Sequence, residues 1–430
     1  MSAGILFLIF VIALSVSIPV GVTLGIVAIL PNLVDPSFAA APQLILRSMI
    51  GGVDSFPILA VPMFILSGIL MAYGGISKKL FNVFAYFIGN KTAGLPIAAI
   101  ITCLFYGAIS GSGPATVAAV GSMTIPLLIE LGYDKVFVTA LVAVSGGLGV
   151  IIPPSIPFIF YGMSSGTSVG DLFIAGVIPG ILIAGCLMLY SYYYCRTKGE
   201  DKEKLHAHWM EVRSNGFLQL FKESFWALLT PVIILGSIYS GIASPTEAAT
   251  ISVFYALFVC LFVYKSLTFK QLPKIFKESV RTYAPILFII SAAIGFARVL
   301  TLMQVPQLVA ASITSVFHGK IAILLILNVF LLLVGMVMDT TPAILILTPI
   351  LLPIVIAVGV NPIHFGVIMV VNLAIGFVTP PVGINLFVAS SLTGIDVIKI
   401  AKKATPFIIA FLIALMLITF IPEISLFLVG

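Results

Sequence analysis

Long apolar runs, separated by short polar or glycine- and proline-rich stretches, fill almost the whole chain. An α-helix needs about 20 apolar residues to cross a bilayer. The runs predict crossings near 3–30, 55–73, 79–90, 136–163, 171–195, 226–264, 283–302, 304–317, 363–395 and 404–428. Two further apolar regions, 95–130 and 320–357, predict pairs of shorter helices. The pattern therefore predicts an all-α, polytopic membrane protein.

The charged segment 196–225 interrupts this pattern near the middle of the chain. It contains RTKGEDKEKLHAHWMEVRSN, whereas the other polar stretches are shorter. Lys and Arg are enriched in the cytoplasmic loops of membrane proteins. We therefore predict that this segment is a cytoplasmic linker between a first half, 1–195, and a second half, 226–430.

The two halves repeat the same proline pattern. The separation is 228 residues for Pro57/Pro285 and Pro114/Pro342, and 227 residues for Pro153/Pro380 and Pro154/Pro381. Self-similarity at a fixed offset indicates an internal repeat. Counting crossings outward from a cytoplasmic linker makes the two copies inverted, with their paired short helices opening from opposite sides.

Two features of 226–281 bear on this inversion. Five cations in 265–281 would lie outside the cell, so we predict that this segment is an amphipathic helix on the membrane surface. The stretch SPTE, 244–247, is a helix-start signature. A helix that begins there splits 226–264 into two crossings and undoes the inversion, and the sequence leaves this alternative open.

The stretch GAISGSGPATVAAVG, 107–121, breaks an apolar region with glycines and one proline. Proline disfavours helix at the residue before it and is well suited to open a new helix. The region 95–130 is therefore predicted to be a re-entrant helical hairpin, and MDTTP, 338–342, predicts a second hairpin over 320–357. Irregular backbone at membrane depth is tolerated only where it is buried in protein or lines a watery cavity.

Two broken helices, 136–163 and 363–395, each contain a Pro-Pro pair. Proline has no N–H to donate, so four carbonyl groups are predicted to be free: those of Gly149, Val150, Gly376 and Phe377. Free carbonyls in a low dielectric are costly unless they bind something, and hard cations take oxygen ligands, which makes Na⁺ a natural partner. Four broken elements in two matched pairs favour this function over mere close packing of small residues.

Asp339 lies at the predicted tip of the second hairpin. A carboxylate inside the membrane is a functional candidate by default, and the alternative is a helix cap without an ion. Asn385 follows the second break, where it either orients a substrate or caps the resumed helix.

Composition and motifs argue against other classes of protein. Hydrophobic residues make up 61% of the chain and charged residues 8%, against about 25% charged residues in soluble domains. The cysteines form no CxxC pair and no phosphate-binding loop motif occurs, so neither a redox centre nor ATP hydrolysis is predicted. The sequence contains no pattern that pairs a nucleophile with a general base, so an enzyme is not predicted. An ion channel is the rival interpretation, but inverted repeats in one chain favour alternating access.

These motifs together resemble the large membrane subunit of the tripartite ATP-independent periplasmic (TRAP) transporters. The resemblance covers essentially the whole chain and is carried by GAISGSGPATVAAVG, GGLGVIIPPSIP (146–157), MDTTPAILILTPILLP (338–353) and GFVTPPVGINLF (376–387). It implies an elevator-type carrier with a scaffold and a transport domain, coupled to about two Na⁺ ions rather than to ATP. It also implies import of an organic acid anion, such as sialic acid or a C4-dicarboxylate, across a bacterial or archaeal cytoplasmic membrane.

The resemblance further implies two partners, a small four-helix membrane subunit and a periplasmic substrate-binding protein. It implies a first Na⁺ site formed by Ser110, Gly111, Ser112 and Gly113 with Gly147, Gly149 and Val150. The second site would be formed by Asp339, Thr340 and Thr341 with Gly376, Val378, Thr379 and Gly383. The substrate carboxylate is expected near Ser112, Thr341 and Asn385, facing the positive ends of the two returning helices. The alternative is a Na⁺- or H⁺-coupled anion transporter that needs no binding protein.

Overall fold

The structure is a computed structural model that describes residues 3–36, 38, 41–214, 216–316 and 319–429. Within these ranges every regular element is helical, and nine helical segments are long and apolar enough to cross a membrane. The prediction of an all-α, polytopic membrane protein is therefore confirmed.

The first half of the chain runs from α1 to α10. The bounds are α1 Ala3–Ser15, α2 Val20–Val34, α3 Pro42–Val53, α4 Ala60–Tyr73, α5 Ile76–Ile88, α6 Gly94–Ser110, α7 Gly113–Glu130, α8 Lys135–Ser145, α9 Ile156–Ser165 and α10 Val169–Lys198. Short 3₁₀ segments at Phe56–Leu59 and Gly146–Val150 precede α4 and follow α8.

The linker and the second half run from α11 to α21. The bounds are α11 Lys202–Ser214, α12 Gly216–Tyr239, α13 Pro245–Phe258, α14 Leu272–Leu302, α15 Val305–Val316, α16 Lys320–Val337, α17 Thr340–Ala357, α18 Pro362–Gly376, α19 Ile384–Thr393, α20 Val397–Phe420 and α21 Glu423–Leu426. A π turn, Val259–Val263, extends α13.

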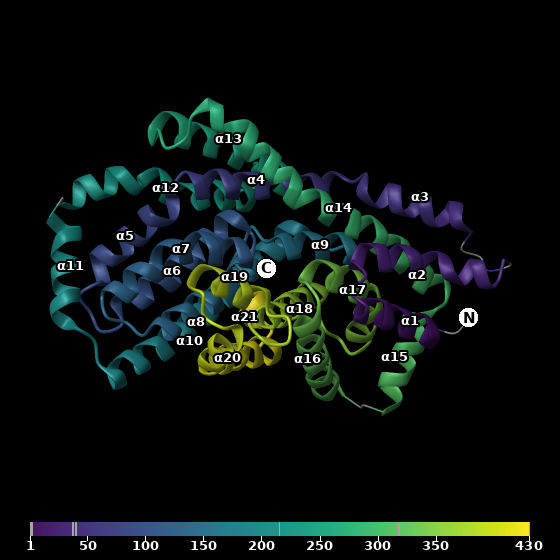
Figure 1. Ribbon diagram of the computed structural model, residues 1–430. Coiled ribbons are helices and arrows are strands. Elements are labelled where there is room, and N and C mark those ends of the chain that lie inside the picture. The colour runs from purple at the N-terminus through teal and green to yellow at the C-terminus, as the bar shows by residue number, and fades with distance from the viewer. Residues whose placement is uncertain (1–2, 37, 39–40, 215, 317–318, 430) are drawn as a thin grey trace.

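The helices form two groups that pack against each other (Figure 1). The scaffold group contains α1–α5 and α12–α15, in which α14 packs on α2, α3 and α4, and α13 packs on α4. The hairpin group contains α6–α10 and α16–α21, in which α20 packs on α8 and α10. The two groups meet where α5 contacts α6 and where α14 and α15 contact α17.

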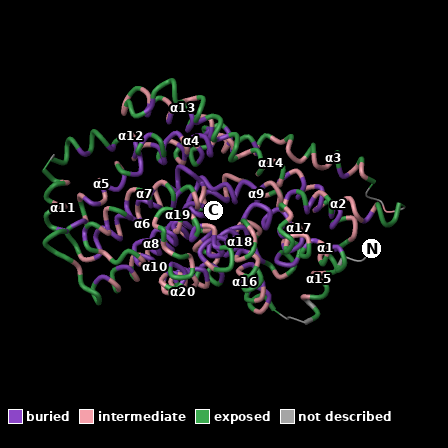
Figure 2. The backbone as a smooth tube through the Cα atoms, viewed as in Figure 1, coloured by how far each residue is buried: buried purple, intermediate pink, exposed green. Residues whose placement is uncertain are grey.

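The two broken helices lie in the core of the hairpin group. Every residue from Phe137 to Gly162 is buried, and so is every residue from His364 to Gly376. Figure 2 shows this buried backbone in the middle of the molecule, with exposed residues concentrated on the outer helices. Backbone polar groups at such positions must be paired or bound.

Glycine and proline end and restart the hairpin helices. α6 ends at Ser110, and Gly111 then adopts φ +61°, a conformation that glycine reaches without steric cost. Pro114 lies in the first turn of α7 and Pro342 in the first turn of α17. In Figure 1, α6 and α7 lie on the side of α11, whereas α16 and α17 lie on the side of the N-terminus. The two hairpins therefore lie on opposite sides of the middle of the molecule, as expected for inverted repeats.

The prediction of one crossing over 226–264 is wrong. The segment holds α12 and α13, because Ser244 and Glu247 form a capping box in which each side chain pairs with the other's backbone amide. Such a box satisfies N–H groups that a helix start leaves unpaired. The split does not undo the inversion, since the two hairpins still lie on opposite sides of the molecule's middle.

The predicted surface helix over 265–281 is also corrected. This segment forms a 3₁₀ turn, Phe269–Gln271, and the first turns of the continuous helix α14. The preceding Tyr264 lies beside the middle of α12, where its hydroxyl accepts a hydrogen bond from the Ala227 backbone amide at 3.1 Å. Because α12 and α13 are two candidate crossings, the chain returns to the linker side before the cations of 265–281.

Three other predicted crossings correspond to shorter helices. The region 3–30 is divided between α1 and α2 by a turn at Ser17, which has φ +66°. The regions 79–90 and 304–317 belong to α5, with 13 residues, and α15, with 12 residues. At about 1.5 Å per residue such helices are too short to span a bilayer alone.

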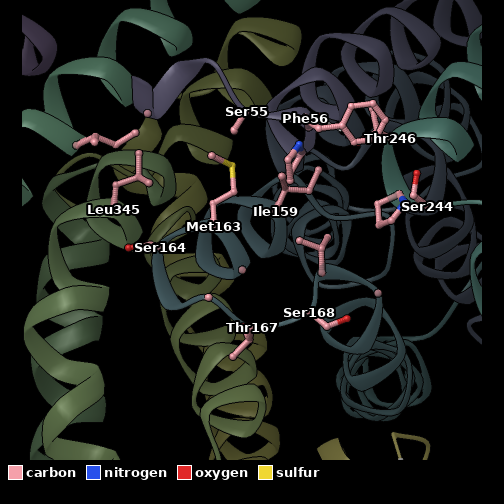
Figure 3. Close-up of a pocket in the computed structure, with 18 of the residues that line it drawn as sticks. Ser55, Phe56, Ile159, Met163, Ser164, Thr167, Ser168, Ser244, Thr246 and Leu345 are labelled. Carbon is pink, nitrogen blue, oxygen red and sulfur yellow. Dashed lines mark hydrogen bonds between the residues drawn. The ribbon is translucent and has the colours of Figure 1, made fainter. Parts of the chain in front are cut away.

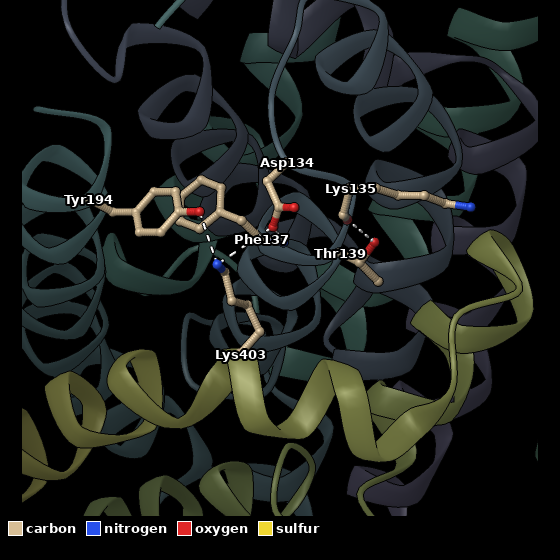
Figure 4. A network of polar contacts seen from close by, with 6 residues as sticks. All are labelled: Asp134, Lys135, Phe137, Thr139, Tyr194 and Lys403. Atoms are coloured by element: carbon tan, nitrogen blue, oxygen red, sulfur yellow. Dashed lines mark hydrogen bonds and ion pairs between the residues drawn. The ribbon is translucent and has the colours of Figure 1, made fainter. Parts of the chain in front are cut away.

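A polar network at the linker end ties together the two halves of the hairpin group (Figure 4). Lys403 of α20 donates to the Tyr194 hydroxyl of α10 at 2.9 Å and lies 3.6 Å from the Asp134 carboxylate. Tyr194 stacks on Phe137 of α8 with ring centroids 3.8 Å apart. These contacts join helices of both repeats into one unit.

Candidate functional site

The tip of the first hairpin is held by its own hydroxyl groups. Thr116 donates from Oγ1 to the Ser112 carbonyl at 2.8 Å, and the Ser110 and Thr116 hydroxyls lie 3.0 Å apart. Ser110 is buried and Ser112 is half-buried. The tip therefore presents backbone and hydroxyl oxygens in a fixed arrangement.

This tip packs directly on the first broken helix. A Cβ added at Gly107 would lie 2.6 Å from the Cα of Gly149, and one added at Gly149 would lie 2.8 Å from the Ser112 carbonyl oxygen. Ile156 donates its amide to the Gly111 carbonyl at 3.4 Å. The structure thus brings together the two segments, 110–113 and 147–150, in which the resemblance implies a first ion site.

The second hairpin contacts the second break in the same way. A Cβ added at Gly376 would overlap the backbone of Gly335 in α16, and Val382 donates its amide to the Met336 carbonyl at 3.1 Å. Close backbone contact between a hairpin and a break therefore occurs in both repeats. Only glycine permits it, because any side chain would fill the space.

Asp339 caps α17. One carboxylate oxygen, Oδ1, accepts from the Thr340 amide at 2.7 Å and lies 3.4 Å from the Thr340 hydroxyl. Asp339 is exposed, whereas Thr340 and Thr341 are buried. The capping contact leaves the second carboxylate oxygen available for an ion.

The remaining residues of the second predicted site lie at the break between α18 and α19. Gly376 ends α18, and Thr379 donates from Oγ1 to the Ile375 carbonyl at 2.8 Å, with Val378 beside it. Gly383 has φ +52° and precedes α19. The backbone contact of α16 with this break links these residues to the hairpin that carries Asp339.

The prediction that four carbonyl groups are free is wrong for three of them. The Val150 carbonyl accepts from the Ser155 hydroxyl. The Gly376 carbonyl accepts a hydrogen bond from the Thr379 backbone N–H at 3.2 Å. The Phe377 carbonyl accepts one from the Asn385 backbone N–H at 3.0 Å. Ser155 and Asn385 follow the Pro-Pro pairs, whereas Thr379 directly precedes the second pair, and together these groups supply the hydrogen bonds that the prolines cannot. Each carbonyl keeps a second lone pair that can bind a cation.

Asn385 is buried behind the first hairpin tip. Its Nδ2 donates to the Ala143 carbonyl at 3.0 Å, which turns Oδ1 toward Gly113, and Oδ1 has no hydrogen-bond partner among the described residues. A side chain of the second repeat therefore completes the surroundings of the first hairpin. The structure brings Asn385 beside Gly113, the residue after Ser112, whereas Thr341 lies in the first turn of α17.

Two further buried oxygens were missed by sequence reasoning. Ser145 Oγ and Asn372 Oδ1 have no hydrogen-bond partner within the described part of the chain. The two residues are 227 apart, the same offset as the paired prolines, and each lies one helical turn before the glycine that contacts a hairpin, Gly149 or Gly376. The repeat offset could have singled them out.

Buried oxygens without partners fit a cation that prefers oxygen ligands. No group of three His, Cys, Asp or Glu side chains that could hold a metal occurs in the described ranges. A cation bound at these breaks would meet neutral oxygens and at most one carboxylate, that of Asp339. This chemistry suits Na⁺ better than a transition metal.

Two crevices separate the scaffold and hairpin groups. The linker-side crevice has a volume of about 670 Å³ and reaches the first hairpin tip; its lining includes Ile69, Lys78, Ser110, Ser112, Ala118, Ser122 and Glu278. The far-side crevice has a volume of about 760 Å³; its lining includes Ser55, Ser168, Thr246, Ala297, Leu345 and Pro349. Figure 3 shows hydroxyl side chains from several elements around this second crevice. Both volumes suit a small organic molecule.

The two crevices are related by the internal repeat. Lining residues of one match lining residues of the other at offsets of 227 or 228, in the pairs Ala118/Leu345, Ser122/Pro349 and Ile69/Ala297. Each crevice thus lies between a returning hairpin helix, α7 or α17, and the equivalent part of the scaffold, α4 or α14.

A multi-pass helical protein with two hairpins, two broken helices and two repeat-related crevices has the architecture of a membrane transport protein. A family profile described as "Tripartite ATP-independent periplasmic transporter, DctM component" matches residues 6–424. The chain therefore belongs to the family of TRAP transporter large permeases. The members of this family are transporter permeases and not enzymes.

Similar proteins agree with this family. The chain is 44% identical over 99% of its length to "Isethionate TRAP transporter permease protein DctMQ" of Oleidesulfovibrio alaskensis, of which it spans 66%. It is 42% identical to a C4-dicarboxylate TRAP large permease of Pseudomonas aeruginosa, with 87% of this chain and 86% of that one covered. It is 36% identical to a sialic acid TRAP large permease of Vibrio cholerae, with 95% and 94% covered.

The fold is also shared with a solved structure. The crystal structure of the Alcanivorax borkumensis YdaH transporter, described as having an unusual topology, matches with a TM-score of 0.64. The match covers 95% of this chain and 98% of that one at 15% identity. At this identity the similarity concerns the fold alone.

Proposed function

We propose that this chain is the large membrane subunit of a Na⁺-coupled carrier that imports an organic anion into a bacterial or archaeal cell. The observation that carries the proposal is the pair of repeat-related crevices, each beside a hairpin that contacts a broken helix. Two repeat-related crevices, each beside its own hairpin, suit alternating access, in which the substrate site opens to one side of the membrane and then to the other.

In this proposal the hairpin group moves as a unit against the scaffold group, as in an elevator. The contacts among Lys403, Tyr194 and Asp134 support the idea of one rigid moving body. The linker-side crevice serves release and the far-side crevice serves entry.

Two Na⁺ ions would be held by oxygens of the hairpin tips and breaks. Ser110–Gly113 with Gly147, Gly149 and Val150 would hold one ion, aided by Ser145 and Asn385. Asp339–Thr341 with Gly376–Thr379 and Gly383 would hold the other, aided by Asn372. The bound cations supply positive charge near the hairpin tips, which favours an anionic substrate there.

The substrate is an organic anion that carries a carboxylate or a sulfonate. The N-termini of α7 and α17, at the hairpin tips, offer amide N–H groups to such a group. Relatives named for isethionate, C4-dicarboxylates and sialic acid support this class; we retain sialic acid and a C4-dicarboxylate as first candidates. Family membership also supports two partners, a small membrane subunit and a periplasmic substrate-binding protein, in a cytoplasmic membrane.

Counterflow in proteoliposomes tests this function. Vesicles that hold the permease and the small subunit are preloaded with unlabelled anion, and labelled anion is added outside with its binding protein. A carrier accumulates label transiently against its gradient, whereas a channel does not. Accumulation that persists at full rate without the binding protein supports instead a transporter that needs no partner.

A further inference from the structure

The linker-side crevice carries charged side chains, and the far-side crevice does not. Lys78 and Glu278 line the linker-side crevice, whereas no charged side chain occurs among the described residues that line the far-side crevice. At offsets of 227 and 228, Lys78 corresponds to Val305 and Pro306, which are apolar. The charge is thus an addition to one repeat and not a requirement of the shared fold.

The acid of this crevice is already engaged. Glu278 accepts a hydrogen bond from the Tyr73 hydroxyl at 2.8 Å. No ion pair joins Lys78 to Glu278 or to any other acid in the described ranges. Lys78 is exposed to the crevice, so its ammonium group is available to an anion.

The neighbouring lysine has a different environment. Lys79 is half-buried, and its ammonium lies 4.2 Å from the centre of the Tyr264 ring, a distance typical of a cation–π contact. Its carbonyl accepts from the Ser224 hydroxyl at 3.1 Å. Lys79 therefore joins α5 to α12 and to the turn after α13, while Lys78 of the same helix lines the crevice.

We propose that Lys78 binds the anionic group of the substrate in the linker-side crevice and so determines the affinity for anions on that side. Ser110 and Ser112 line the same crevice at the hairpin tip. An anion leaving the tip would exchange hydroxyl and amide contacts for the Lys78 ammonium before it reaches water. This inference rests on the proposed function, because it assumes that an organic anion passes through the crevice.

The test compares Lys78→Gln, Lys78→Arg and Lys79→Gln in the full complex. Each permease is reconstituted with its small subunit, and exchange is measured with labelled isethionate, succinate or N-acetylneuraminate, whichever the unmodified complex transports. The half-saturating concentration is determined separately for substrate on the linker side and for the loaded binding protein on the other side. Lys79→Gln is the matched control, because it removes a neighbouring charge that does not line the crevice.

We expect Lys78→Gln to raise the linker-side half-saturating concentration about tenfold, as expected for loss of a charge-assisted hydrogen bond. Lys78→Arg should stay within about twofold of the unmodified protein, since the charge remains. Lys79→Gln should leave this affinity unchanged even if stability falls. An unchanged affinity in Lys78→Gln, or an equal loss in Lys78→Arg, would overturn the assignment. Failure of the unmodified complex to exchange any of the three anions would instead contradict the substrate class of the proposed function, on which the assignment depends.

Discussion

Replacing Gly149 by alanine tests the contact between the first hairpin tip and the first broken helix. The new Cβ would lie 2.8 Å from the Ser112 carbonyl oxygen and closer still to the Thr116 hydroxyl. Normal contact begins near 3.4 Å, so the tip must move by roughly half an ångström or more to relieve the overlap with Ser112. Overpacking of this kind costs about 1–3 kcal/mol.

The cost should appear in sodium affinity. If the ion-bound arrangement needs the close contact, a loss of about 1–3 kcal/mol corresponds to roughly a fivefold to hundredfold rise in the half-saturating Na⁺ concentration. The assay is initial uptake of labelled anion by the reconstituted complex across a series of Na⁺ concentrations. Substrate affinity of the separate binding protein should not change.

Gly185→Ala is the matched control for this variant. Gly185 lies in α10, and a Cβ added there meets no atom within 4 Å. Size-exclusion chromatography and thermal unfolding show whether Gly149→Ala folds. A folded Gly149→Ala protein with the Na⁺ dependence of Gly185→Ala would refute the idea that this contact shapes an ion site.

Three further predictions concern the second site and the partners. Asp339→Asn should preserve the cap of α17, because Asn caps helices as well as Asp. If the carboxylate binds the ion, the substitution should raise the half-saturating Na⁺ concentration at least about tenfold. An unchanged half-saturating concentration in the uptake assay would remove Asp339 from the site. Gly376→Ala should reduce transport more than Gly236→Ala, since only the former Cβ overlaps another helix, and equal rates would contradict the repeat equivalence of the two breaks. Uptake at low substrate concentration should require both the small subunit and the loaded binding protein, and full-rate uptake by this chain alone would disprove that dependence.

The hairpins and breaks could be predicted because their signals are local. Pro114 and Pro342 each follow a glycine- or polar-rich break and lie in the first turn of a helix, where proline is favoured, and Gly111 permits the turn that ends α6. The division of 226–264 was visible only as an alternative, because the turn before Ser244 is short and mostly apolar. Hydropathy averages over such a turn and reports one long segment.

The chemistry of the site depends on packing that the sequence does not display. Proline lacks the backbone N–H that would bond the Phe377 carbonyl in a continuous helix. The sequence cannot show that the backbone N–H of Asn385 donates to this carbonyl instead. Nor does it show that the Asn385 side-chain oxygen is left without a partner next to Gly113. Likewise Lys78 and Lys79 are equivalent in sequence, and only the course of α5 directs one to the crevice and the other to Tyr264.

Sodium-driven uptake is the most direct test of the central claim. The permease, its small subunit and its binding protein are reconstituted without ATP, and uptake of labelled anion is measured with an inward Na⁺ gradient or with choline in place of Na⁺. We predict concentrative uptake with Na⁺ and almost none with choline. Equal uptake in the two buffers would contradict the assignment of the hairpin tips and breaks as sodium sites.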